Sequence, residues 1–260
     1  MRRFPLFWLI LATFTGGYAA FLLATILATA DFAPPEVWRT SLASPEIRHA
    51  IALSLITCSV SAVLCLILSV PVGYLLARTR FPGKNLLEAL LDIPIFLPPM
   101  VMGLCLLIFF QTDLGHFIER GVRFTYTVAG VILAQFVIAA AFSIRTMRGT
   151  FEHLSSRPED VALTLGCTRG QAFWRVTLPA ARRGMVAATS VAWARSFGEF
   201  GPVLVFAGAT RMRTEVLPTT VWLELSVGNL DAAVTVSLLM IVLAVVILVV
   251  FRHFGEKEGG

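Results

Sequence analysis

Long runs of apolar residues constrain this chain more than any other feature. A hydrocarbon core about 30 Å thick is crossed by roughly 20 consecutive apolar helical residues. Six stretches approach or exceed that length, at 7–29, 51–77, 93–110, 125–144, 185–206 and 232–251. Backbone polar groups in lipid must find partners within the protein, which a helix provides along its own length. The sequence therefore predicts an all-α integral membrane protein with six transmembrane helices, in a single domain over residues 1–260.

Charge is too scarce to coat a soluble protein of this size. Only 14% of the 260 residues are charged and 57% are hydrophobic, whereas a soluble domain carries about 25% charged residues. The net charge of +5 could suggest nucleic acid, but the basic residues sit in short segments between the apolar runs. That pattern orients a protein in a lipid bilayer, and no nucleic-acid partner is expected.

The basic residues also predict the orientation. If the chain starts in the cytoplasm, 14 of the 21 Lys and Arg residues lie in cytoplasmic segments and six lie outside. The positive-inside rule then places both termini in the cytoplasm. The first run has an alternative interpretation as a cleaved signal peptide, because Arg2 and Arg3 precede it and Ala28-Thr29-Ala30 resembles a cleavage site. Cleavage would leave the other five spans oriented as before.

The third stretch begins among prolines, at Pro94, Pro98 and Pro99. Proline removes a backbone donor and bends a helix, and the freed carbonyl groups need protein or water partners within a membrane. A bend is therefore expected at this end of the span. It can be a fixed structural kink or a moving gate, and the sequence leaves both open.

Residue patterns for catalysis, metal binding and ATP hydrolysis are missing from the sequence. Gly83-Lys84 lacks the upstream glycine and the following hydroxyl of a phosphate-binding loop. The four cysteines form no C-x-x-C pair and are expected to act as small hydrophobic residues, and the four histidines are scattered over loops and ends. We expect no catalytic residue, no metal and no cofactor, so the chain is not expected to be an enzyme.

The long cytoplasmic connection at 145–183 is too patterned to be a simple turn. Hydroxyls, a proline and two acids over 155–160 predict a helix start, and Gly166 predicts its end. A second short helix is expected over 169–176, before Leu178-Pro179. The prediction is a helix, a turn and another helix lying across the membrane face.

This connection resembles the EAA loop of bacterial ABC importer permeases, written E-A-A-x3-G-x9-I-x-L-P. The chain keeps the spacing, with Asp160 for the glutamate and valines at positions 161 and 176. The resemblance implies a coupling helix that docks into a separate ATPase subunit. The residues it assigns to that contact are Asp160, Ala162, Leu163, Gly166, Leu178 and Pro179.

The fifth stretch carries a second resemblance, over 194–201 and 205–208. It is similar to the GEFG…AG segment of oxyanion importer permeases, the molybdate, tungstate and sulfate group, and the likeness spans roughly residues 50–250. Arg195 and Glu199 are four residues apart, so on a helix they share one face and can pair. With Ser196 they form either a buried ion pair or a polar lining for the anion path.

Together the resemblances imply a type I ABC importer permease with a core at 50–250, in a bacterial or archaeal inner membrane. The family arrangement implies two permease copies, two ATPase subunits and one extracytoplasmic binding protein that selects the oxyanion. Sulfate, thiosulfate or another small solute remains an alternative substrate. A secondary transporter working without ATP is the other alternative, but it would more often show ionisable residues in several spans or an inverted repeat.

Overall fold

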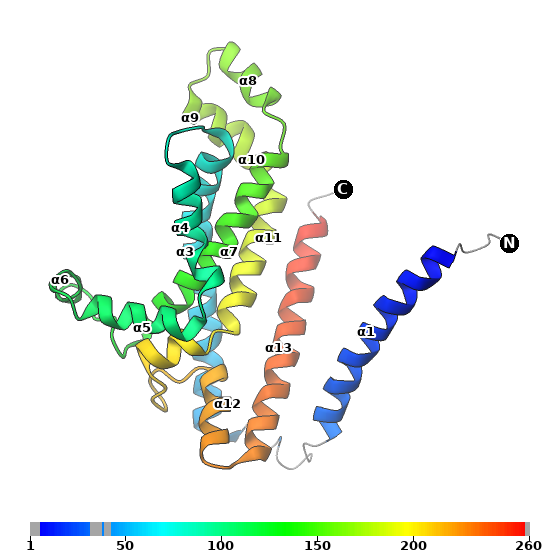
Figure 1. The fold of residues 1–260 in the computed structure, drawn as a ribbon, viewed down its shortest axis with the longest axis vertical. Coiled ribbons are helices and arrows are strands. Elements are labelled where there is room, and N and C mark those ends of the chain that lie inside the picture. The colour runs from blue at the N-terminus through cyan, green and yellow to red at the C-terminus, as the bar shows by residue number, and fades with distance from the viewer. Residues whose placement is uncertain (1–5, 32–37, 39–42, 258–260) are drawn as a thin grey trace.

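The computed structural model describes residues 6–31, 38 and 43–257, and the elements within these residues are helices (Figure 1). The basic start at Arg2 and Arg3 lies outside the described residues. Four helices are long and apolar enough to cross a membrane. They are α1 (Leu6–Asp31), α3 (Pro45–Arg78), α7 (Val128–His153) and α13 (Leu230–Lys257). The predicted all-α membrane class is confirmed.

The third predicted span is a broken one. Helix α4 (Lys84–Phe96) and helix α5 (Pro99–Phe110) meet at an angle of 112°. Leu97 between them is extended, with ψ at 142°, because the residue before a proline is biased away from the helical region. The expected bend is confirmed, and the chain turns aside through α5 to the short helix α6 (Asp113–Glu119), at the far end of that arm in Figure 1.

The fifth predicted span is not one helix either. Helix α11 (Arg182–Phe197) ends at Gly198, and the π-helical segment η2 (Val203–Ala207) follows after a break. Gly198 at the helix end and Pro202 before η2 explain the interruption, since glycine favours helix ends and proline lacks a backbone donor. The described residues therefore hold four long spans, or five with the bent pair, in place of six continuous ones.

The core of the bundle is built from α3, α7 and α11. Small buried side chains line the contacts, which lets the helix axes approach closely. They include Ala50, Cys58, Ala62 and Cys65 of α3, Ala139 and Ala140 of α7, and Ala192 of α11. Hydroxyl pairs such as Ser143 to Ser69, at 2.9 Å, join α7 to α3. Helix α1, by contrast, stands apart from the bundle over most of its length and contacts α13 (Figure 1).

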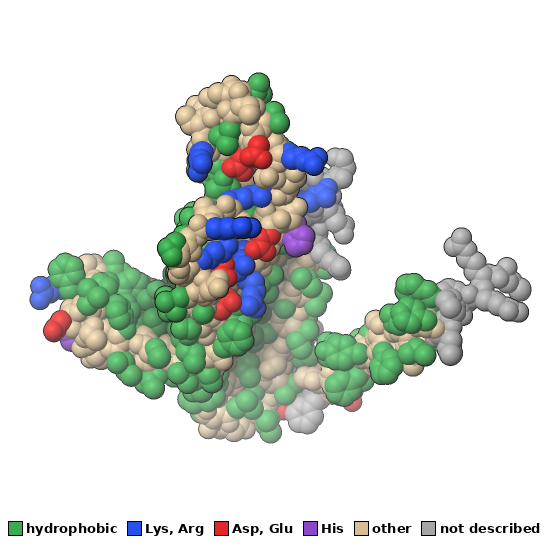
Figure 2. Space-filling model, turned by 45° about the horizontal axis from the view of Figure 1, so that its top comes forward, with side chains coloured by type: hydrophobic (Ala, Val, Ile, Leu, Met, Phe, Trp, Pro, Cys, Tyr) green, Lys and Arg blue, Asp and Glu red, His purple; other side chains and the backbone are tan. Residues whose placement is uncertain are grey.

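The short helices of the long connection cap one end of the bundle. They are α8 (Arg157–Thr164), α9 (Arg169–Ala172), the π-helical η1 (Phe173–Thr177) and α10 (Leu178–Ala180). Helix α12 (Leu217–Ser226) lies at the opposite end, and the final turns of α13 point toward the α8 end (Figure 1). Most charged side chains visible in Figure 2 gather at the α8 end, with hydrophobic side chains over much of the remaining surface.

Candidate functional site

The 145–183 connection folds as the predicted helix, turn and helix. The backbone N–H of Arg157 donates to Ser155 Oγ at 3.3 Å, and acids occupy the first turn of α8. Gly166 ends α8 with φ at +91°, and the N–H of Cys167 donates to the carbonyl of Ala162 at 3.0 Å. A capping box between Thr168 and Gln171 starts α9.

Gly166 is required for its backbone conformation, not for close packing. A Cβ atom added there would meet no atom within 4 Å. The positive φ is the constraint, because side chains other than glycine rarely adopt that region. The predicted helix end at Gly166 is confirmed, and the backbone conformation is its cause.

The exposed apolar surface of this segment differs from the one predicted. Ala162 is buried at 8% exposure and Leu163 is half-buried, so both face the body of the protein. Val161, Leu165 and Trp174 are 56%, 80% and 68% exposed. We call these three residues the apolar tip. Exposed large apolar side chains of this kind are typical of surfaces that bind another protein or a membrane.

Leu178 and Pro179 lead from this segment into α11. Leu178 is half-buried and Pro179 is exposed. The helical turns continue through α10 to Ala180, beyond the predicted range of 169–176, and α11 begins at Arg182. Beside this junction lies a cavity of about 750 Å³ between α7 and α11, and His153, Arg182 and Arg183 contribute to its lining.

Arg195 and Glu199 form the predicted ion pair, with 2.7 Å between Arg195 Nη1 and Glu199 Oε1. Glu199 is 1% exposed, whereas about a third of the Arg195 side chain is exposed, and its guanidinium lies 5.4 Å from the Phe142 ring centre. The pair does not share one helix face as expected, because α11 ends before Glu199. The buried Ser196 Oγ has no hydrogen-bond partner.

The two broken spans pack against each other at their breaks. A Cβ atom on Gly201 would lie 2.8 Å from Met100 Cγ, and one on Gly103 would lie 2.7 Å from Pro202 Cα. Glycine therefore allows the start of α5 and the stretch leading into η2 to touch. Interrupted helices of this kind line substrate paths in membrane transporters, because their free backbone groups can face polar ligands.

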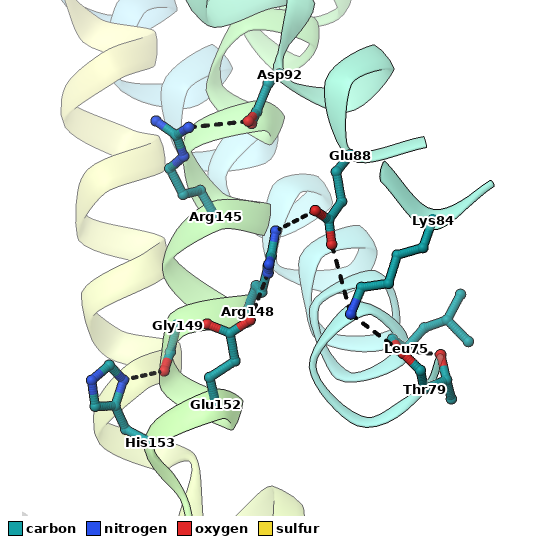
Figure 3. Close-up of polar contacts among 10 residues, drawn as sticks. All are labelled: Leu75, Thr79, Lys84, Glu88, Asp92, Arg145, Arg148, Gly149, Glu152 and His153. Carbon is teal, nitrogen blue, oxygen red and sulfur yellow. Dashed lines mark hydrogen bonds and ion pairs between the residues drawn. The ribbon is translucent and has the colours of Figure 1, made fainter. Parts of the chain in front are cut away.

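A row of ion pairs joins α4 to the C-terminal half of α7 (Figure 3). Arg145 reaches Asp92 at 3.0 Å and Arg148 reaches Glu88 at 3.0 Å. Arg148 also pairs with Glu152 at 2.7 Å, and Glu88 with Lys84 at 3.7 Å. We call this row the α4–α7 ladder. These ion pairs hold α4, the first half of the bent span, against α7.

Sequence reasoning missed the apolar tip and the ladder. The 84, 88 and 92 spacing of charges on one helix face could have revealed the ladder, but those residues fall before the predicted third span. The described residues contain no group of three His, Cys, Asp or Glu side chains that could hold a metal ion. The described residues thus bring together an exposed apolar tip, two interrupted spans in contact and a row of ion pairs between α4 and α7.

Known proteins resemble the chain over most of its length. The family model described as "Binding-protein-dependent transport system inner membrane component" matches residues 69–257. The chain is 35% identical over 244 residues to the molybdenum transport system permease protein ModB of Mycobacterium tuberculosis, covering 92% of this chain and 91% of that protein. It is 30% identical over 248 residues to the sulfate transport system permease protein CysT of Escherichia coli, covering 92% and 88%.

A further relative and a solved structure also resemble the chain over most of its length. The molybdate/tungstate transport system permease protein WtpB of Thermococcus kodakarensis is 33% identical over 197 residues, covering 76% of this chain and 75% of that protein. A bacterial ABC transporter that imports the polysaccharide alginate superposes with a TM-score of 0.76 at 17% identity, covering 97% of this chain and 96% of that one. At that identity the likeness concerns the fold alone.

Proposed function

The chain belongs to the binding-protein-dependent transport system inner membrane components, and on that premise we propose that it is the permease subunit of an ATP-driven importer for molybdate or tungstate. The curated relatives named for molybdenum and for molybdate or tungstate are 35% and 33% identical to it. The relative named for sulfate is 30% identical over a similar length, which keeps sulfate as the second candidate substrate.

The exposure of the apolar tip is the observation that supports an ATPase subunit as a partner. Val161, Leu165 and Trp174 are more than half exposed, and they belong to the connection whose short helices cap the bundle (Figure 1). We assign the contact with an ATPase subunit to this tip together with Asp160, which is exposed beside it. Ala162 and Leu163 hold the unit to the body, Gly166 sets its turn, and Leu178 and Pro179 connect it to α11.

The remaining partners and the orientation follow from the same proposal. Two copies of the chain pair around a translocation path, each copy binds one ATPase subunit, and an extracytoplasmic binding protein delivers the oxyanion. The bias of basic residues and the common direction of the α8 end and the end of α13 support cytoplasmic termini in an inner membrane. The path runs beside the two interrupted spans, with Arg195, Ser196 and Glu199 near it.

Reconstitution tests this proposal. The purified chain, an ATPase subunit and a binding protein are placed in liposomes, and ATP-dependent uptake of radiolabelled molybdate is measured against competing tungstate and sulfate. Val161→Asp with Leu165→Asp should abolish co-purification with the ATPase, because charged groups would replace the apolar contact. Val227→Asp is the matched control, since Val227 is 70% exposed at the opposite end. Retained co-purification in the double variant would contradict the assigned contact.

A further inference from the structure

The Glu159 carboxylate holds the 145–183 connection to two other parts of the chain at once. Glu159 lies in the first turn of α8. Its Oε1 accepts a hydrogen bond from the hydroxyl of Tyr74, one turn before the end of α3. Its Oε2 accepts one from Thr177 Oγ1 in η1 at 2.9 Å. Each oxygen therefore serves a different element, one far away in the sequence and one just before α10.

Packing fixes both donors in place. The Tyr74 ring lies edge-on to Phe151 of α7, at 5.5 Å between ring centres, and to Phe173 of η1, at 4.7 Å. Phe151 is fully buried and Thr177 is 5% exposed. Tyr74 is half-buried, and moving its hydroxyl away from Glu159 would cost the ring its contacts with Phe151 and Phe173.

Helix capping alone does not explain this arrangement. An acid in the first turn of a helix is favoured by the helix dipole wherever its side chain points, and the neighbouring Asp160 meets that need while remaining exposed. The Glu159 side chain turns instead toward partners 85 and 18 residues away. Hydrogen bonds to a charged acceptor are about twice as strong as neutral ones, so these two bonds should hold α8 firmly to α3 and η1. We call the pair of bonds the Glu159 joint.

We infer that Glu159 is a positioning residue that makes α8 move as one body with the end of α3 and with the chain leading into α11. This inference rests on the proposed function. Loops join α8 to the chain on both sides, and it packs mainly on η1 and α9. Without the carboxylate, a push on the apolar tip would rock α8 about these loops. With it, the push reaches α3 through Tyr74 and α11 through Thr177.

The joint itself is tested on the isolated chain in detergent micelles, without any partner. Amide hydrogen exchange over 157–164 should be about tenfold faster in Glu159→Gln and in the double variant Tyr74→Phe with Thr177→Val, because each weakens both charge-assisted bonds. Tyr18→Phe is the control, since Tyr18 is 67% exposed on α1. Unchanged exchange over 157–164 in both variants would overturn the inference.

Coupling is then measured in the liposome system with ATPase and binding protein. Glu159→Gln should keep its ATPase subunit and its thermal stability, yet consume at least about fivefold more ATP per anion imported, and Glu159→Asp should recover part of the coupling. A merely structural residue would lower stability, ATP hydrolysis and uptake together, and that outcome would overturn the inference. Failure of the wild-type chain to bind an ATPase would refute the proposed function. The hydrogen-exchange result would still show whether Glu159 holds α8 to α3 and η1.

Discussion

Replacing Arg195 by methionine should destabilise the protein strongly, because it leaves the Glu199 carboxylate buried without its partner. Glu199 is 1% exposed and its Oε1 lies 2.7 Å from Arg195 Nη1. Breaking a buried ion pair from one side costs about 3–5 kcal/mol. For a chain of this size each kcal/mol lowers the melting temperature by about 2–4 °C, so we expect a loss on the order of 10 °C.

The opposite change should cost less, because the two partners are buried to different extents. Glu199→Leu leaves Arg195 with about a third of its side chain exposed and with the Phe142 ring beneath the guanidinium. Leaving one polar group unsatisfied costs about 1–3 kcal/mol. Changing both residues removes the pair without leaving a buried charge, so the double variant should lose no more than Glu199→Leu alone.

The assay is thermal unfolding in detergent micelles, followed by tryptophan fluorescence, for both single variants and the double variant. Arg183→Met is the control, since Arg183 is exposed in the first turn of the same helix. A double variant that loses the sum of the two single losses would refute the reasoning, because additive losses mean that the residues do not interact. Arg195 would then belong to the anion path, and its replacement should impair uptake at unchanged stability.

Three further predictions concern the ladder, the turn and the orientation. Glu88→Gln or Arg148→Gln alone should lower the melting temperature by about 2–4 °C, and the double variant should lose less than the sum of the two single losses; additive losses would mean that the two residues do not interact. Gly166→Ala and Gly166→Trp should destabilise the turn to a similar degree, about 1–2 kcal/mol, because φ is the constraint; a far greater protease sensitivity of the tryptophan variant would point to crowding instead. In intact cells an impermeant maleimide should leave Cys167 unlabelled and should label Val227→Cys; the opposite result would invert the topology.

Local patterns predicted the parts of the fold that local chemistry determines. The prolines at 98 and 99 predicted the bend between α4 and α5, and Gly166 predicted the end of α8, because both act through their own backbone. The start of α4 was missed, since Lys84, Glu88 and Asp92 interrupt an apolar search while lying on a helix face that pairs with α7. The apolar pattern also predicted one continuous span across the break at Gly198, because an irregular segment can be as apolar as a helix.

Contacts between distant segments could not be predicted from the sequence. Tyr74 and Glu159 are 85 residues apart, and no spacing rule links them. The same holds for which side of α8 faces outward: Ala162 and Leu163 matched the family motif, while the structure turns Val161 and Leu165 to the surface. Pairing of Arg195 with Glu199 was predicted because their separation is short enough to survive the end of the helix between them.

The isolation of α1 implies that this chain contains two kinds of membrane helix with different tolerance to mutation. The apolar window of α1 has 0% of its residues buried, against 33% for α3. A side chain that packs on no other helix of its own chain is constrained chiefly by its transfer free energy, whereas one packed between helices is also constrained by its volume. Within a single chain, exchanging Leu23 for phenylalanine should therefore be nearly silent, while exchanging Cys58 for leucine should force helices apart. A saturation scan of both helices would rank α1 substitutions by polarity and α3 substitutions by size.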